Sequence, residues 1–234
     1  MNKEVKLSLA LNNSRTHPTG MAHVIAILNT KGGVGKSTLA TNLARALQLD
    51  GSEVLVVDSD PQGTARDWRE TQGEDVDLPG VFGVDRPTLE KDIPKVTNTF
   101  DYIVVDGAAK VTKMSVSAIK AADVVLIPVQ PSAADLWAVE ELAEMVTTRQ
   151  TLTDGRPKAA FVVSNQKKRT RLAADVDAAL NEYELPVFEA RTSHLVAYPE
   201  AMAAGVTVLD YEPSGNAADE IRAIHRELKE FIHG

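Results

Sequence analysis

The chain has 234 residues, of which 44% are hydrophobic, and this length fits one sizeable α/β domain better than two. It contains no cysteine, so disulfides, thiolate zinc sites and iron–sulfur clusters are excluded. No apolar run is long enough to span a bilayer and no secretory signal pattern opens the chain, so we expect a cytoplasmic protein with no membrane partner. The formal net charge of -8 argues only weakly against a nucleic-acid partner, because such contacts depend on local charge patches.

The beginning of the chain shows no periodic hydrophobic pattern. Asn, Ser, Thr, Pro and Gly are frequent between residues 12 and 20, and a second methionine, Met21, directly precedes the first strong strand pattern. We predict a flexible leader over residues 1–22 and a single folded domain over residues 23–234. A functional arm, an unstructured extension and an upstream start codon all remain open as explanations of the leader.

Strand-like and helical segments alternate along the rest of the chain. Apolar, β-branched runs predict strands at 24–29, 53–58, 102–106, 124–129 and 159–164, and weaker strand patterns occur at 80–83, 187–189 and 206–209. Helical patterns lie between them, at 36–49, 64–71, 88–97, 115–121, 134–152, 172–183, 198–204 and 216–232. This alternation is typical of a doubly wound α/β fold, in which helices cover both faces of a mainly parallel sheet.

A glycine-rich segment follows the first predicted strand and opens the first predicted helix, which is the context of a phosphate-binding loop (P-loop). Glycines let successive backbone N–H groups turn toward phosphate oxygens, and the N-terminus of the helix adds a favourable dipole. We therefore expect this loop to hold ATP and magnesium (Mg2+) through Lys31, Gly32, Gly33, Val34, Gly35, Lys36, Ser37 and Thr38.

The side chains of the loop have distinct expected roles. Lys36 would lie against the β- and γ-phosphates, and Thr38 would contact the α-phosphate. Ser37 would offer its hydroxyl to magnesium, a hard cation that prefers oxygen ligands. The loop departs from the general pattern at one place, because Thr30 stands where a first glycine is usual and Lys31 follows it.

With this second lysine, the loop resembles the deviant Walker A motif of the ParA/MinD family of P-loop NTPases. The resemblance covers about residues 22–232, and small plasmid-type ParA proteins are most similar in length. In that family the early lysine, here Lys31, reaches across a nucleotide sandwich dimer. The resemblance therefore implies a homodimer that forms with ATP and in which Lys31 and Lys36 both serve catalysis.

Two predicted strand ends agree with this family. Residues 56–63 resemble the switch I motif, which implies that Asp60 orients the attacking water and that Asp58 supports the magnesium shell. Residues 102–108 have the form of a Walker B strand, which implies that Asp106 meets magnesium through water. Asp residues also form turns at strand ends, which leaves a purely structural role open for Asp58.

The segment after the fifth strong strand pattern carries two further candidates. Asn165 stands where the family uses an asparagine on the adenine edge, although a turn asparagine is an alternative. A basic cluster follows, which either contacts DNA phosphates in a dimer or forms a solvated surface. The cluster consists of Lys167, Lys168, Arg169 and Arg171, and further cations are Arg191, Arg222, Arg226 and Lys229.

Several branches of the family are excluded by composition. Nitrogenase iron protein and cluster carriers need cysteine ligands, and residues 216–232 lack the basic face of a membrane-targeting MinD helix. The resemblance implies a cytoplasmic, nucleoid-associated ATPase that dimerises on ATP, binds DNA non-specifically and hydrolyses ATP with a ParB-like stimulating partner, for partition of a plasmid or chromosome or positioning of a protein cargo. The alternative is an ATP-dependent biosynthetic ligase similar to dethiobiotin synthetase or cobyrinic acid amidase.

Overall fold

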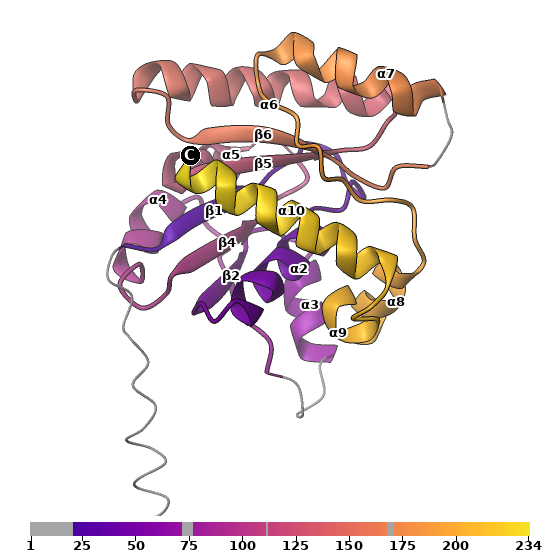
Figure 1. Cartoon of the computed structure of the whole chain (residues 1–234). Coiled ribbons are helices and arrows are strands. Elements are labelled where there is room, and N and C mark those ends of the chain that lie inside the picture. The colour runs from indigo at the N-terminus through magenta and orange to yellow at the C-terminus, as the bar shows by residue number, and fades with distance from the viewer. Residues whose placement is uncertain (1–20, 72–76, 111, 168–170) are drawn as a thin grey trace, which may run out of the picture.

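The computed structural model describes residues 21–71, 77–110, 112–167 and 171–234. A parallel six-stranded sheet in the order β3-β2-β4-β1-β5-β6 forms its centre (Figure 1). The predicted doubly wound α/β fold class is confirmed. The strands are β1 (His23–Ile27), β2 (Val54–Asp58), β3 (Gly80–Gly83), β4 (Tyr102–Asp106), β5 (Val124–Val129) and β6 (Lys158–Val163).

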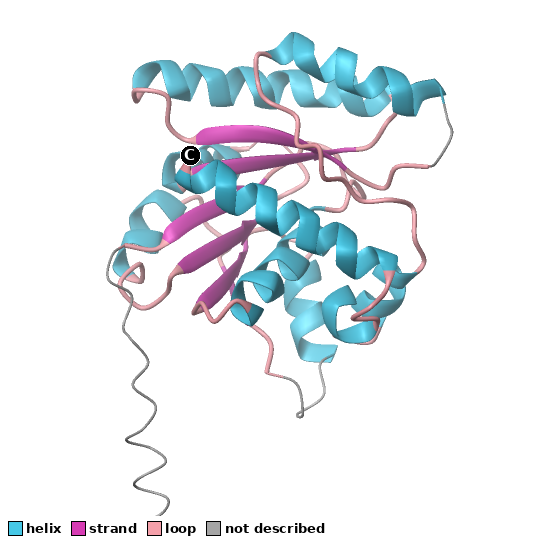
Figure 2. Ribbon diagram, in the orientation of Figure 1, coloured by secondary structure: helices cyan, strands magenta, loops and turns pink. Residues whose placement is uncertain are grey.

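Helices lie on both sides of this sheet (Figure 2). They are α2 (Lys36–Leu49), α3 (Thr64–Thr71), α4 (Leu89–Asp92), α5 (Lys113–Ala121), α6 (Ala133–Leu152), α7 (Arg171–Leu180), α8 (Ala197–Ala203), α9 (Val208–Tyr211) and α10 (Asn216–His233), with 3-10 turns at Ile93–Lys95 and Asn181–Tyr183. Among the described helices, we find none that combines the length and the apolar character needed to cross a bilayer.

Two hydrophobic clusters fill the space between the sheet and the helices. Ile25 and Ile27 of β1 point to the face covered by α2, α3, α8, α9 and α10. Val24 and Ala26 point to the opposite face, which α4, α5, α6 and α7 cover. Because both faces are buried, the central strands consist of nearly uninterrupted apolar residues, and every residue of β4 is buried.

The strong strand predictions agree with the structure to within two residues, and the weak pattern at 80–83 is β3. The weak strand prediction at 206–209 is wrong, because helix α9 begins at Val208. The Val208 N–H donates to Asn42 Oδ1 (3.0 Å), and the Val206 carbonyl accepts from Trp68 Nε1 (2.9 Å). These contacts from α2 and α3 hold the segment among the helices, so tertiary packing overrides its β propensity.

Two other predictions differ from the structure. The segment at 187–189 forms only an isolated bridge, between Val187 and Phe161, and no strand. The helix predicted at 88–97 is a single α turn that continues as a 3-10 turn. Pro94 explains this difference, because proline has no N–H with which to continue the α-helical hydrogen bonds.

Two predictions, the leader and the basic cluster, concern residues that lie partly outside the described ranges. The leader predicted over residues 1–22 lies outside them except for its last two residues, of which Met21 is exposed and Ala22 is buried. Lys168 and Arg169 of the basic cluster also lie outside these ranges, and the structure does not describe the side chain of Arg171.

Candidate functional site

The P-loop lies at the carboxyl-terminal edge of the sheet, between the end of β1 and the start of α2. From β1 the chain crosses to β2 on one side, whereas β5 and β6 lie on the other, so this edge is a topological switch point where parallel sheets bind ligands. Gly33 (φ +76°) and Gly35 (φ +91°) adopt left-handed conformations that favour glycine. Added side chains at Gly32, Gly33 or Gly35 would meet nothing within 4 Å, so the loop borders open space, as a phosphate cradle requires.

Polar side chains from the neighbouring strand ends hold the loop in this shape. Gln130 Nε2 donates to the Gly33 carbonyl (2.7 Å), and Ser164 Oγ donates to the Val34 carbonyl (2.8 Å). Asn29, directly after β1, donates to a β5 carbonyl (2.7 Å). These three residues were not among the predicted site residues, although each stands within two residues of a strand end, which is the signal that identifies them.

The two residues that set this loop apart from the general pattern both contact α6. Thr30 Oγ1 donates to the Ala138 carbonyl (2.6 Å), which explains a hydroxyl side chain at the position where glycine is usual. Lys31 Nζ pairs with Asp135 Oδ1 (2.9 Å), and Asp135 is only 2% exposed and also bonds the Ser132 hydroxyl. Lys31 is therefore neutralised by its own chain in this structure.

Lys36 and Asp106 form the buried electrostatic centre of the site. Lys36 Nζ donates to the Lys31 carbonyl (2.9 Å). Burial lowers the pKa of Lys36, and the carboxylates of Asp106 and Asp60 oppose that change. Burial also raises the pKa of Asp106 to about 7, an effect that Ser37 and Lys36 only partly offset. Among the described residues, no donor completes a hydrogen bond to either carboxylate oxygen of Asp106, and Ser37 is no exception.

An unpartnered buried carboxylate fits a site for a cation that arrives with a ligand. Among the described residues, no three His, Cys, Asp or Glu side chains gather into a ready-made metal site. Asp106 and the Ser37 hydroxyl would leave most positions around magnesium to phosphate oxygens and water, which is the usual arrangement for this ion in nucleotide sites. The residues present therefore fit a magnesium–nucleotide complex better than magnesium alone.

The switch I candidates lie next to Asp106, but their environment is different. Asp58 is the register partner of Asp106 in the sheet and accepts three hydrogen bonds, from the Asp60 N–H (3.0 Å) and from Arg66 N (3.1 Å) and Nε (3.3 Å). Ser59 ties this turn to β4, since its N–H and its hydroxyl both donate to the Asp106 carbonyl (2.9 Å each). Arg66 and Ser59 are site residues that the sequence analysis did not identify.

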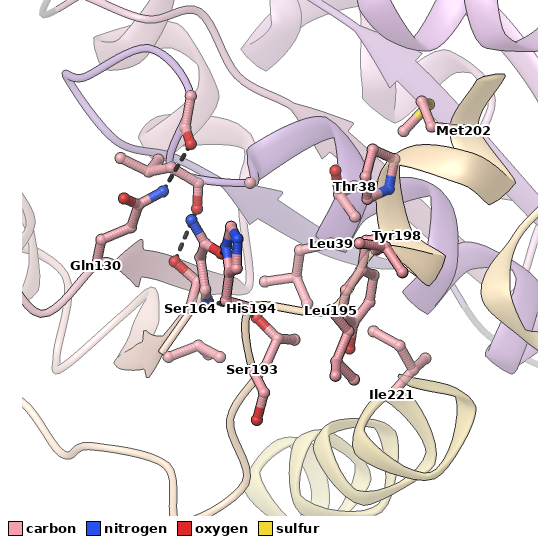
Figure 3. A pocket seen from close by; sticks show the side chains of 18 residues that line it. Thr38, Leu39, Gln130, Ser164, Ser193, His194, Leu195, Tyr198, Met202 and Ile221 are labelled. Carbon is pink, nitrogen blue, oxygen red and sulfur yellow. Dashed lines mark hydrogen bonds between the residues drawn. The ribbon is translucent and has the colours of Figure 1, made fainter. Parts of the chain in front are cut away.

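A pocket of about 390 Å³ opens beside the P-loop (Figure 3). Asn165, in a left-handed conformation (φ +52°), lines it, and its Oδ1 lies 2.7 Å from His194 Nδ1. In the neutral tautomer that is protonated at Nδ1, His194 donates this hydrogen bond and its Nε2 is an acceptor. The remaining lining includes apolar side chains such as Val162 and Met202, and this mixture suits a flat heterocyclic base.

Several of the candidate cations for DNA binding pair with acidic side chains of the same chain. Lys167 is the last described residue before the gap at 168–170. Three of the other cations have acidic partners within 3.4 Å: Arg191 with Asp177, Arg222 with Asp219 and Lys229 with Asp50. These pairs favour the solvated-surface interpretation for α10 over a bare positive face.

Comparison with known proteins agrees with this geometry. The model of the CobQ/CobB/MinD/ParA nucleotide binding domain matches residues 25–217. The Maintenance of carboxysome distribution protein A of Halothiobacillus neapolitanus is 29% identical over 88% of this chain and 96% of its own. The Chromosome-partitioning ATPase Soj of Thermus thermophilus is 28% identical, over 87% and 94%. An ATP complex of a Cyanothece McdA variant has the same fold, with a TM-score of 0.75, 18% identity and coverage of 92% and 97%. The chain belongs to the ParA/MinD family of nucleotide-binding proteins.

Proposed function

We propose that this protein is a magnesium-dependent ATPase of the ParA type, which dimerises on ATP and uses hydrolysis to position a cargo. The observation that carries the proposal is the buried Asp106 carboxylate, which has no hydrogen-bond partner and lies beside Lys36 at the mouth of the P-loop. A permanently unpaired buried charge costs several kcal/mol. The fold tolerates this arrangement because a magnesium–nucleotide complex would supply the missing partner.

Different groups of the loop would bind different parts of magnesium–ATP. Backbone N–H groups from Gly32 to Lys36 would bind phosphate oxygens, and the Lys36 ammonium would neutralise the terminal phosphates. Magnesium, when bound by Ser37 and Asp106, supplies further charge neutralisation for phosphoryl transfer. Asp60 would orient the attacking water, and Asp58 would support the magnesium shell.

The pocket beside the loop would take the adenosine part of ATP. With the Asn165 amide oxygen bonded to a His194 that is protonated at Nδ1, the two side chains would present one donor, Asn165 Nδ2, and one acceptor, His194 Nε2. The N1 and N6 atoms of adenine are an acceptor and a donor. Asn165 would therefore read the adenine edge together with His194.

ATP-dependent dimerisation would follow from Lys31. In this structure Lys31 is paired with Asp135, and in the dimer it would leave that partner and reach the nucleotide of the other subunit. Loss of the γ-phosphate would remove contacts that exist only in the dimer, so hydrolysis would favour separation of the subunits.

The cargo and the partners are inferred from the relatives. One of them distributes carboxysomes and another partitions chromosomes, according to their names, which supports positioning of a large cargo in the cytoplasm. We propose that the ATP dimer binds nucleoid DNA without sequence preference, with Lys167 and its neighbours as the first candidates for phosphate contacts. A ParB-like adaptor protein would stimulate hydrolysis and link the cycle to a plasmid, a chromosome or a protein assembly.

A salt-dependent DNA-binding assay with ATP, ADP or no nucleotide tests this proposal. We expect DNA binding only with magnesium–ATP, with an affinity that falls steeply as salt rises. Asp60→Ala should bind ATP and DNA but fail to release, and Asp67→Ala, which removes an exposed carboxylate on the same segment, should behave as the wild type. Equal DNA binding in all three nucleotide states would contradict the proposal.

A biosynthetic ligase is the second candidate, since the matching family model also includes CobQ and CobB. Such an enzyme would consume ATP only when a small acid substrate is present. Turnover that depends on a carboxylic acid and ignores DNA would therefore favour the ligase.

A further inference from the structure

Arg66 binds both ends of the turn that carries Asp60. It lies in the first turn of α3, and its side chain runs back to the end of β2. Its backbone N–H and its Nε both donate to Asp58 Oδ2 (3.1 and 3.3 Å), while Nη2 donates to the Asp60 carbonyl (3.1 Å). Nη1 lies 3.5 Å from Asp85 Oδ1, after β3. One guanidinium thus joins three segments around switch I.

The space for this guanidinium depends on two glycines from different segments. A Cβ at Gly83, the last residue of β3, would lie only 2.9 Å from Arg66 Cδ. A Cβ at Gly63 would lie 3.2 Å from Arg66 Nη2, and Gly63 also has a φ of +70°. Side chains are absent at the two places where the guanidinium passes, so the fold provides a fitted slot for it.

The contacts of Arg66 define where Asp60 can be. The Asp60 N–H donates to Asp58 Oδ1, and Asp58 in turn is held by Arg66. The Asp60 carbonyl accepts from Arg66 directly. Both backbone polar groups of Asp60 therefore contact the Arg66–Asp58 pair, and the Asp60 carbonyl accepts in addition from the Gly63 N–H (3.0 Å). Asp58 is fully buried, which limits the ways in which the pair can rearrange.

We propose that Arg66 is a positioning residue for ATP hydrolysis, which holds Asp60 where it can orient the attacking water. This inference rests on the ATPase function proposed above. The Arg66 side chain contacts Asp58, Asp60 and Asp85 and not the glycine-rich loop that would hold the phosphates, as far as the described residues show. The hydrolysis step should therefore depend on Arg66, and ATP affinity should not.

The test is single-turnover ATP hydrolysis at saturating magnesium–ATP, with ATP affinity measured separately by calorimetry. Misplacement of a reacting group by about 1 Å costs about 100-fold in rate, so Arg66→Ala should lose about that much while ATP affinity stays within about twofold. Arg66→Lys keeps the charge but lacks the planar fork, and should fall between Arg66→Ala and the wild type. Millimolar guanidinium should restore part of the rate of Arg66→Ala.

Arg45→Lys is the matched control, because Arg45 on α2 is another partly buried arginine that pairs with an aspartate, Asp210 (2.6 Å), away from switch I. It should keep the wild-type hydrolysis rate. If Arg66→Ala does not fold, Arg66→Lys carries the test alone.

The outcomes separate the two proposals. A wild-type saturating rate in Arg66→Lys, or a loss confined to ATP affinity, overturns the role of Arg66 and leaves the ATPase function intact. Absence of hydrolysis in the wild type, with DNA and without it, overturns the proposed function and the role of Arg66 with it.

Discussion

Two neighbouring strands of this sheet end in the same way and produce opposite environments. β2 (VLVVD) and β4 (YIVVD) each deliver an aspartate to the carboxyl edge, and Asp58 and Asp106 are register partners with no solvent exposure. Asp58 accepts three hydrogen bonds, two of them from Arg66, whereas both oxygens of Asp106 lack a hydrogen-bond partner in the described part of the chain. The hydrogen bonds of the Asp58 carboxylate all come from within the chain, whereas we propose that the Asp106 carboxylate gains its partner from a ligand.

This difference shows that a strand-ending aspartate does not by itself indicate a metal site. What separates the two is the segment that follows. After β2 the chain turns into α3 and returns Arg66 to the carboxylate. After β4 the chain passes Gly107, whose close approach to Ile27 and Leu28 leaves no room for a side chain, and none of the described residues that follow returns a hydrogen-bond donor to Asp106.

The largest expected effect concerns the pH dependence of stability in the absence of nucleotide. Burial raises the pKa of Asp106 from its ordinary 3.8 to about 7, so between these values the folded state binds more protons than the unfolded state. The free energy of unfolding should therefore be unaffected below pH 3.8, fall as the pH rises to about 7, and stay level above it. At about 1.4 kcal/mol for each pH unit, the loss is on the order of 4 kcal/mol.

Asp106→Asn should abolish that loss, and urea unfolding of both proteins between pH 4 and pH 8 measures it. Asp58→Asn serves as the comparison, because it removes the neighbouring buried carboxylate, which accepts three hydrogen bonds. Parallel pH curves for the wild type and Asp106→Asn would show that Asp106 is not the unpaired charge that we describe.

The next effect concerns the cation that faces Asp106. Lys36→Ala removes the buried ammonium that would neutralise the terminal phosphates, and a charged hydrogen bond of this kind contributes about 3 kcal/mol. ATP affinity should fall by at least about 100-fold in a calorimetric titration. Unchanged affinity would mean that the glycine-rich loop does not hold ATP phosphates.

The hydrogen-bonded carboxylate of Asp58 should contribute to the free energy of unfolding. Asp58→Asn replaces an acceptor of three hydrogen bonds by an amide that cannot satisfy them all, so the free energy of unfolding should fall by about 2 kcal/mol. Asp177→Asn is the control, because it breaks an Asp–Arg pair that is 43% exposed at Asp177 and should cost less than about 1 kcal/mol. Equal losses in the two variants would remove the distinction between Asp58 and a surface acid.

The smallest effect should come from the outer end of the Arg66 contacts. Asp85 is 78% exposed and lies 3.5 Å from Nη1. Asp85→Asn should change the free energy of unfolding by less than about 0.5 kcal/mol. A loss as large as that of Asp58→Asn would show that Arg66 is held mainly by Asp85 and not by Asp58.

The central strands and the P-loop could be predicted from the sequence because their signals are local. The strands are apolar runs that end in polar residues, and the loop has its glycines and lysines at fixed spacings. The weak pattern at 206–209 failed because its conformation depends on Asn42 and Trp68, which are distant in sequence.

The same limit applies to the partners within the site. Asp135, His194 and Arg66 contact Lys31, Asn165 and Asp58 only after helices α6 and α3 and the loop before α8 have packed. The sequence places a carboxylate at the end of β2 and another at the end of β4. It does not show which of them receives an arginine, because that depends on the direction in which α3 leaves the sheet.

We propose above all that Asp106, and not Asp58, binds a cation that arrives with ATP. Calorimetric titration of ATP with and without magnesium, into the wild type, Asp106→Asn and Asp58→Asn, tests it most directly. We expect magnesium to strengthen ATP binding in the wild type and in Asp58→Asn, and to have no effect in Asp106→Asn. A full magnesium effect in Asp106→Asn, together with its loss in Asp58→Asn, would contradict this account.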